Sequence, residues 1–341
     1  MDRKWFLRLL GYGSIGSIVA RSVTNRSVSR KTLKPNKLQR GDTIGLVSPA
    51  SRLPKEKQYD KIIKQVKKLG NKVKVGKNAR DTYGYFAGSD EQRAADLNQM
   101  FADNTVDAIL PFRGGWGCNR ILSLIDYETI RNNPKILVGF SDITSLLNAI
   151  YAKTGLITFH GPVGKVEWTD YTIKHFRNAL GGEDPYTLDI PKDNLCKDCK
   201  SLSVITPGKA KGKLLGGNLS VLTAMMGSDY TPEWGGNILF LEDVGEDVYR
   251  IDRMLTQLKL NGVFDKISGF VFGQCAACDR ANSYSLTLQQ VFDDHIKPFG
   301  IPAYSGAMIG HISKMGTLPV GMPAEINAQE GTITLAEAAT I

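Results

Sequence analysis

The sequence lacks any run of about 20 consecutive apolar residues, the length that a helix needs to cross a membrane. Hydrophobic residues make up 42% and charged residues 23% of its 341 positions, an ordinary balance for a globular protein. We therefore expect a soluble protein without a stable membrane anchor. A chain of this length also favours two domains over one.

Excess charge is lacking over most of the chain as well. The formal net charge is +9, but residues 1–40 alone carry ten Lys and Arg against one Asp, which accounts for the whole excess. The remaining residues carry equal numbers of basic and acidic side chains. A nucleic-acid-binding groove would need the basic excess on the folded body, so the sequence argues against nucleic acid as a partner.

The basic segment at the N-terminus, residues 1–36, is similar to a twin-arginine export signal. Residues 2–8 read Asp-Arg-Lys-Trp-Phe-Leu-Arg, and residues 9–20 are weakly apolar and rich in Gly and Ser. Lys4 stands where such a signal prefers a second arginine. The pattern predicts export to the periplasm, and a cytoplasmic protein with a disordered basic arm is the alternative. Whether the segment is cleaved stays open.

Cysteine is scarce, and four of the five cysteines form two C-x-x-C pairs, Cys196/Cys199 and Cys275/Cys278. The pairs are too far apart in the sequence for a compact zinc ribbon. Export would favour disulfides. Disulfides, a metal site and free thiols all stay open at this stage.

The pattern of apolar segments predicts an α/β protein with two domains. Between residues 37 and 180 short apolar strands alternate with amphipathic helices, which indicates a doubly wound, mainly parallel sheet. The strands predicted there are residues 43–47, 72–75, 106–112 and 135–140. After a polar linker, residues 181–202, the apolar segments predict a smaller, strand-rich, β-barrel-like domain, residues 203–341. Its predicted strands are residues 203–206, 238–242, 267–272 and 325–335.

Ser141 lies where a predicted strand turns directly into a helix. Residues 139–142 read Gly-Phe-Ser-Asp, and such a turn holds a serine hydroxyl at the carboxyl end of a parallel sheet, where open α/β sheets bind ligands. The start of the following helix favours an oxyanion nearby. Ser141 is therefore a candidate nucleophile, although Ser is also a favoured helix cap. The hydrolase pattern G-x-S-x-G is not met, because Ile143 occupies the place of its second Gly.

A glycine-rich loop follows the strand at residues 106–112. Residues 113–117 read Arg-Gly-Gly-Trp-Gly, and adjacent glycines let backbone N–H groups approach a ligand closely. That suits a phosphate or a developing oxyanion, and a tight turn is the simpler alternative. Neither G-x-G-x-x-G nor G-x-x-x-x-G-K-[ST] occurs, so nucleotide binding has little support.

A serine nucleophile needs a base and an acid that orients it. Of the four histidines, His175 and His295 stand among charged residues, which predicts an exposed position for both. His160 and His311 are both candidates for the base, and spacing does not decide between them. Glu242 follows the apolar residues 238–241, so it is either the orienting acid or a loop cap.

Taken together, five ordered motifs resemble the LD-carboxypeptidase (muramoyltetrapeptide carboxypeptidase) family of serine peptidases, from about residue 37 to the C-terminus. The motifs are Gly-Phe-Ser-Asp-Ile-Thr at 139–144, Arg-Gly-Gly-Trp-Gly at 113–117, Leu-Glu-Asp-Val-Gly-Glu at 241–246, Tyr-Arg-Ile-Asp-Arg-Met-Leu at 249–255, and Gly-His at 310–311 with Leu-Pro-Val-Gly at 318–321.

The resemblance implies a catalytic triad. The serine of the family's Gly-x-Ser-Asp turn is its nucleophile, which assigns that role to Ser141. The same matching assigns the acid to Glu242 and the base to His311. His160 falls in a stretch that we interpret as structural. The triad would then span the two domains, with the cleft between them as the site.

The resemblance also implies how substrate is held. It predicts an oxyanion hole made of the backbone N–H groups of Gly115 and Asp142, in a substrate-binding loop that contains Gly114 and Trp116. Trp116 and Cys118 replace the Tyr and Ser that the family usually has, which changes the wall of the pocket but no member of the triad.

The family's reaction removes the terminal D-Ala of a murein tetrapeptide by cleaving the bond after its L-centred diamino acid, without a metal or other cofactor. One alternative is the microcin-immunity type, which cleaves peptide-nucleotide or acyl-adenylate conjugates. Another, of a different class, is a non-catalytic two-domain ligand-binding protein. The preferred diamino acid and the oligomeric state, a homodimer being one option, stay open.

Overall fold

A computed structural model describes residues 31–182, 186–191, 196, 199–278 and 284–341 of the protein. The predicted export segment therefore lies outside the described residues except for its last six positions, 31–36. The predicted linker at residues 181–202 is described in part. Among the described helices, none combines the length and the apolar character needed to span a bilayer.

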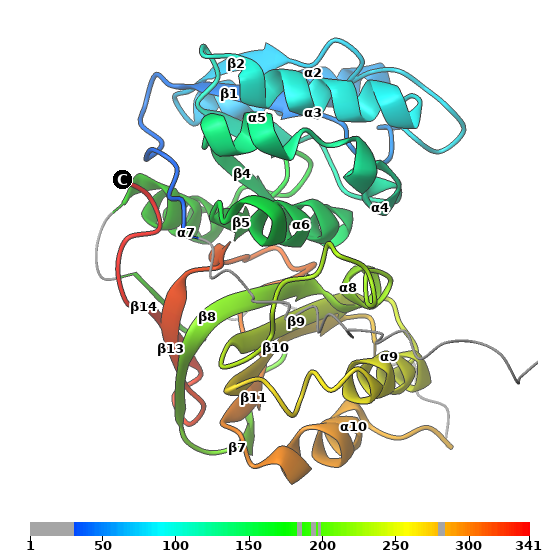
Figure 1. The fold of residues 1–341 in the computed structure, drawn as a ribbon, viewed down its shortest axis with the longest axis vertical. Helices are drawn as coiled ribbons and strands as arrows, with labels where there is room; N and C mark the ends of the chain where they lie inside the picture. Colours follow the sequence, from blue (N-terminus) through cyan, green and yellow to red (C-terminus); the bar gives the residue numbers. More distant parts are fainter. Residues whose placement is uncertain (1–30, 183–185, 192–195, 197–198, 279–283) are drawn as a thin grey trace, which may run out of the picture. The chain divides into compact units, whose positions relative to one another are not determined.

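The first sheet has six strands in the order β12-β5-β4-β3-β1-β2 (Figure 1). Neighbouring strands are parallel except for the pair β12 and β5, which is antiparallel. The strands are β1 (Thr43–Val47), β2 (Lys72–Val75), β3 (Ala108–Pro111), β4 (Ile136–Gly139), β5 (Thr158–His160) and β12 (Leu318–Val320). The helices are α2 (Glu56–Lys68), α3 (Asp90–Ala102), α4 (Cys118–Ile121), α5 (Tyr127–Asn132), α6 (Thr144–Thr154) and α7 (Asp170–Gly181), with 3₁₀ turns η1 (Leu122–Leu124) and η2 (Ser141–Ile143).

The second sheet has eight strands in the order β6-β14-β13-β8-β9-β10-β11-β7 and curls, most visibly along β8 (Figure 1). Its central strands β8, β9, β10 and β11 are parallel, and its outer pairs are antiparallel. The strands are β6 (Thr187–Leu188), β7 (Ser203–Thr206), β8 (Lys209–Asn218), β9 (Ile238–Val244), β10 (Gly269–Ala276), β11 (Ala303–Ser305), β13 (Pro323–Asn327) and β14 (Thr332–Leu335). The helices are α8 (Leu219–Thr223), α9 (Val248–Leu260) and α10 (Leu288–His295), with the 3₁₀ turn η3 (Lys297–Phe299).

This architecture confirms the predicted fold class, a mainly parallel α/β sheet combined with a strand-rich, curled sheet. Ser89 and Gln92 form a reciprocal cap at the start of α3, and β13 and β14 form a hairpin. Strand β12 comes from the C-terminal part of the chain yet joins the first sheet, so each sheet draws on distant sequence.

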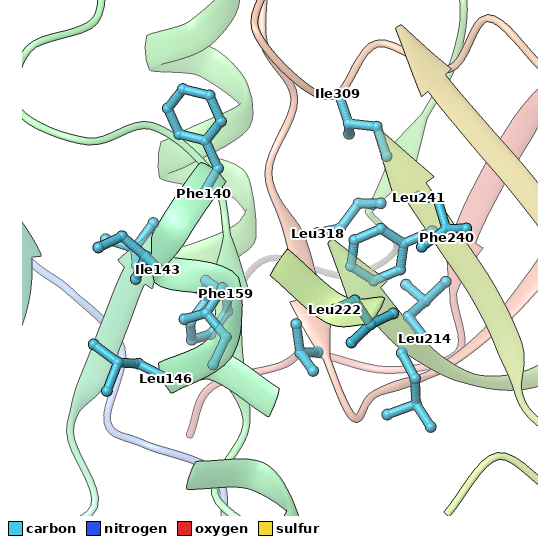
Figure 2. Packing of buried hydrophobic residues seen from close by; sticks show 14 of the residues in the cluster. Phe140, Ile143, Leu146, Phe159, Leu214, Leu222, Phe240, Leu241, Ile309 and Leu318 are labelled. Carbon is cyan, nitrogen blue, oxygen red and sulfur yellow. The ribbon is translucent and has the colours of Figure 1, made fainter. Parts of the chain in front are cut away.

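The buried apolar side chains form one continuous cluster that includes both sheets. Helix α6 lies between the sheets and packs against β5 as well as β8 (Figure 1). Figure 2 shows part of the cluster, with Phe159 from the first sheet, Phe140 directly after its strand β4, and Phe240 and Leu241 from the second sheet. Close packing of this kind fixes the strand ends that carry the candidate site.

The predicted exposure of His175 and His295 was wrong. His175 is 4% exposed and its Nδ1 lies 3.2 Å from the hydroxyl oxygen of Tyr186. His295 is 8% exposed and its Nε2 lies 2.5 Å from a carboxylate oxygen of Asp252. Both histidines lie on amphipathic helices, where charged sequence neighbours occupy a different face of the helix. Local charge therefore did not reveal which way each ring points.

Candidate active site

Ser141 has a backbone conformation that few residues adopt. Its φ is +60°, in the left-handed region, where among the described residues other than glycine only Ala277 also lies. Such conformations cluster at functional sites because the surrounding structure must hold them in place. The capping position of η2 falls on Phe140 and that of α6 on Ile143, so Ser141 is not a helix cap.

The glycine-rich loop packs directly on this serine. A Cβ added at Gly114 would lie 3.0 Å from Cβ of Ser141, 3.2 Å from its Oγ and 3.3 Å from the backbone N of Asp142. Gly115 has a φ of +123°, and a Cβ there would overlap the hydroxyl of Ser51. Only glycine allows the loop to approach so closely. The structure therefore brings together the residues that we predicted as the nucleophile and the oxyanion hole.

Sequence reasoning missed Ser51, which holds this loop in place. The backbone N–H of Trp116 donates to Ser51 Oγ at 3.1 Å. Ser51 follows β1, and the carboxyl ends of parallel neighbours β1 and β3 meet at one edge of the sheet. The Ser-Pro-Ala-Ser turn at residues 48–51 was visible in the sequence, but only the strand order places it beside the loop.

Glu242 and His311 form a hydrogen-bonded pair across two segments of the strand-rich part. Nδ1 of His311 lies 2.9 Å from Oε2 of Glu242, whose side chain is fully buried. Gly310 has a φ of +109°, and a Cβ there would lie 2.9 Å from the same oxygen, so the Gly-His step lets the ring approach the carboxylate. The His311 ring also packs on Phe140, the residue before Ser141, with ring centroids 4.7 Å apart.

Burial and charge act in opposite directions on this pair. Burial raises the pKa of Glu242, but the charge and hydrogen bond of His311 outweigh it, so the pKa lies below its usual range. Burial lowers the pKa of His311, but the charge and hydrogen bond of Glu242, with a further contribution from Asp243, raise it above the ordinary 6.5. An acid–histidine pair of this kind favours the charged imidazolium when it forms.

His160, the other candidate base, has a different environment. It is fully buried on β5, and within the described part of the chain neither ring nitrogen has a hydrogen-bond partner. Burial lowers its pKa to about 4, so the ring is neutral at pH 7. Its ring meets Phe240 edge-on, with centroids 5.4 Å apart. The structure thus pairs His311 with the acid, and it leaves His160 buried without a hydrogen bond to that acid.

Asp243, the residue after Glu242, is a second carboxylate, and its oxygens already accept hydrogen bonds. Asp243 accepts hydrogen bonds from the side-chain amide of Asn218 at 3.2 Å and from the backbone N–H of Ser220 at 2.9 Å. Burial, followed by the charge of Glu242, raises the pKa of Asp243 to about 6. Asn218 ends β8 and was missed by sequence reasoning, although the Gly-Gly-Asn run at residues 216–218 marked a close approach.

A cleft with a volume of about 1130 Å³ lies at this place. Ser141, Asp142 and His311 lie in its wall together with the glycine-rich loop, and Trp116 stands 64% exposed at its rim. The lining residues of the cleft come from the part of the chain before residue 181 and from the strand-rich part. Its wall combines a serine, a histidine that is paired with an acid, and a glycine-rich loop whose backbone N–H groups can approach a ligand. Acyl transfer requires these groups.

The cysteines are placed as well. The structure pairs Cys196 with Cys199 and Cys275 with Cys278 as disulfides. Cys118 is a free thiol, and its complete burial raises its pKa well above the usual range. No group of three or more His, Cys, Asp or Glu side chains suited to a metal lies in the described ranges.

Comparison with known proteins decides the family. Residues 44–161 match the model of the LD-carboxypeptidase N-terminal domain, and residues 211–326 match that of the LD-carboxypeptidase C-terminal domain. The chain belongs to the LD-carboxypeptidase family. Its relatives include proteins named as a probable murein peptide carboxypeptidase and a murein tetrapeptide carboxypeptidase.

Two relatives and one solved structure show the range of this family. The chain is 39% identical to the "Probable murein peptide carboxypeptidase" of Bacillus subtilis, over 89% of this chain and 94% of that protein. It is 32% identical to the microcin C7 self-immunity protein MccF of Escherichia coli, over 87% of this chain and 94% of that protein. A structure of MccF in complex with glutamyl sulfamoyl guanosine superposes with a TM-score of 0.83 at 30% identity, covering 91% of this chain and 100% of that one.

Proposed function

We propose that this member of the LD-carboxypeptidase family is a serine carboxypeptidase that removes the terminal D-Ala from murein tetrapeptides, at the bond after the L-centred diamino acid. The observation that carries the proposal is the hydrogen bond between the buried Glu242 and His311, because His311 lines the same cleft as the left-handed Ser141. The murein peptide carboxypeptidase among its relatives supports the choice of substrate.

The chemistry follows the serine-hydrolase pattern. Oγ of Ser141 attacks the scissile carbonyl carbon while His311 accepts its proton, and Glu242 stabilises the imidazolium that forms. Backbone N–H groups of Gly115 and Asp142 donate to the developing oxyanion. His311 then gives the proton to the leaving amine of D-Ala, and a water molecule hydrolyses the acyl-enzyme. This step regenerates Ser141 and releases the shortened peptide.

A second candidate is cleavage of acyl-sulfamoyl nucleosides, as in the microcin-immunity branch of the family. Its support is the likeness to MccF in complex with glutamyl sulfamoyl guanosine. The exposed rings of Tyr85 and Trp116 at the cleft, with centroids 6.2 Å apart, are also suited to stacking on a flat ring.

The two candidates separate in one experiment. Purified protein is incubated with a murein tetrapeptide and, in parallel, with a glutamyl sulfamoyl nucleoside, and the products are weighed by mass spectrometry. Loss of a single D-Ala from the tetrapeptide is the expected result. An intact tetrapeptide together with a cleaved nucleoside conjugate would instead assign the protein to the second activity.

The pH dependence of kcat/KM tests the acid–base pair. His311 must be neutral to accept a proton, and its pKa is raised by Glu242, so the rate should rise with pH through a midpoint above 6.5. Glu242→Gln keeps the shape of the side chain but removes its charge, which should lower the rate and move that midpoint to lower pH. A midpoint that stays in place in Glu242→Gln would show that Glu242 does not set the charge of the base.

We further propose that the basic segment at residues 1–36 directs export of the folded protein, because it holds almost all of the excess charge and precedes β1. Residues 1–40 fused to a reporter that works only after translocation in the folded state should send it across the membrane. Replacing Arg3 and Lys4 together should keep it inside. A reporter that never leaves the cytoplasm would make the segment a basic arm only.

A further inference from the structure

The cleft wall contains three acids and three basic side chains, and two of the basic side chains have no acidic partner among the residues that the structure describes. The acids are Asp142, Asp243 and Glu246, and the basic side chains are Arg113, Arg120 and Lys165. Arg120 is ion-paired with Asp90, with 2.8 Å between its guanidinium and the carboxylate, and Asp90 also pairs with the buried Arg93. Within the described residues, by contrast, neither Arg113 nor Lys165 forms an ion pair with an acid. A pair of cations without a partner in a cleft indicates an anionic ligand.

The guanidinium of Arg113 is held in place without being neutralised. Its Nε donates to the backbone carbonyl of Gly114 at 3.1 Å, and its Nη1 donates to the backbone carbonyl of Arg52 at 3.3 Å. A guanidinium has five N–H donors, so these two bonds leave donors for a ligand. Because the two carbonyls are uncharged, the full positive charge stays in the cleft. The side chain is therefore ordered before any ligand binds.

Lys165 is brought to the same place by the backbone. Its N–H donates to the carbonyl of Phe112, and the N–H of Gly164 donates to the carbonyl of Pro111, each at 2.9 Å. The segment after β5 is thus tied to the end of β3, next to Arg113. Burial, and next the charge of Arg113, lower the pKa of Lys165. Like charges that line one cleft disfavour each other, and a carboxylate between the two side chains would relieve that cost.

We propose that Arg113 and Lys165 form the subsite for the free carboxylate of the terminal D-amino acid that the enzyme releases. The inference rests on the proposed function, and it specifies which residues bind the C-terminal end of the substrate. Arg113 directly precedes Gly114, which packs on Ser141, so a carboxylate held there lies close to the nucleophile. A planar guanidinium binds a carboxylate through two parallel hydrogen bonds, and an ammonium adds charge. The subsite would confine cleavage to the last peptide bond.

The test measures binding, so it does not depend on turnover. In a Ser141→Ala background, calorimetry compares a murein tetrapeptide that ends in a free carboxylate with the same peptide ending in an amide. We expect the carboxylate form to bind at least about tenfold more tightly, the usual effect of a charge-assisted hydrogen bond. Adding Lys165→Gln or Arg113→Gln should remove that preference, and Arg113→Lys should restore it only in part.

The matched control is Arg120→Gln, which removes from the same cleft a cation that is already ion-paired with Asp90. It should leave the preference unchanged. Circular dichroism shows whether each variant is folded. Lys165→Gln changes an exposed side chain, so the test stays valid even if Arg113→Gln fails to fold. Equal binding of acid and amide, or a preference that survives both substitutions, would overturn the subsite. Failure of wild-type protein to cleave the tetrapeptide, with the binding preference intact, would instead overturn the proposed reaction alone.

Discussion

Ser141→Ala is expected to abolish turnover of a murein tetrapeptide while the protein stays folded. The substitution removes the nucleophile, and removal of a triad serine costs about 10⁴-fold or more in kcat. It deletes a single oxygen atom and almost no packing, so the free energy of unfolding should change by no more than about 1 kcal/mol. Steady-state kinetics and urea unfolding, done on the same preparation, measure the two quantities.

A serine outside the cleft provides the matched control. Ser268 is partly buried at the start of β10, where its hydroxyl donates to the carbonyl of Lys211. Ser268→Ala should keep wild-type kcat. If Ser141→Ala retains more than a trace of activity, the left-handed turn serves the fold alone and the nucleophile lies elsewhere.

His311→Ala and His160→Ala are expected to have different effects on activity. Loss of the base at His311 should lower kcat by about 10²- to 10⁴-fold. It should also lower stability, because the fully buried Glu242 loses its partner. His160 is fully buried among aromatic rings, so His160→Ala leaves a cavity and should cost about 2 kcal/mol or more of stability. Its folded fraction should keep most of the activity.

Kinetics normalised to the folded fraction distinguish the two histidines. The assignment of the base is contradicted if folded His311→Ala protein works at the wild-type rate and folded His160→Ala protein is inactive. Imidazole added to the His311→Ala protein offers a further check, because a small base that enters the cleft should restore part of the lost rate.

Much of the fold could be predicted because it depends on local patterns. Alternating apolar and amphipathic segments revealed the parallel strands of the first sheet, and the Gly-Phe-Ser-Asp run revealed the turn at Ser141. Each of these patterns is formed by residues that are close to one another in the sequence. The apolar residues before Glu242 likewise predicted a buried strand that delivers a carboxylate.

The rest depends on contacts between residues that are distant in the sequence. Glu242 and His311 are 69 positions apart, and no local pattern distinguished His311 from His160. Ser51 meets Trp116 across 65 positions, and Asn218 meets Asp243 across 25. The buried positions of His175 and His295 were mispredicted for the same reason, since exposure depends on which helix face meets the core. The resemblance to a family supplied the choice of His311 that spacing could not.

Labelling with a fluorophosphonate probe tests the central claim most directly. The probe reacts with a serine that an adjacent base has activated, and mass spectrometry of the digested protein locates the adduct. The account predicts a single adduct, on Ser141, that forms in wild-type protein and is lost in His311→Ala. An unlabelled Ser141, or an adduct on a different serine, would contradict it and would leave a protein that binds peptides in this cleft without cleaving them through Ser141.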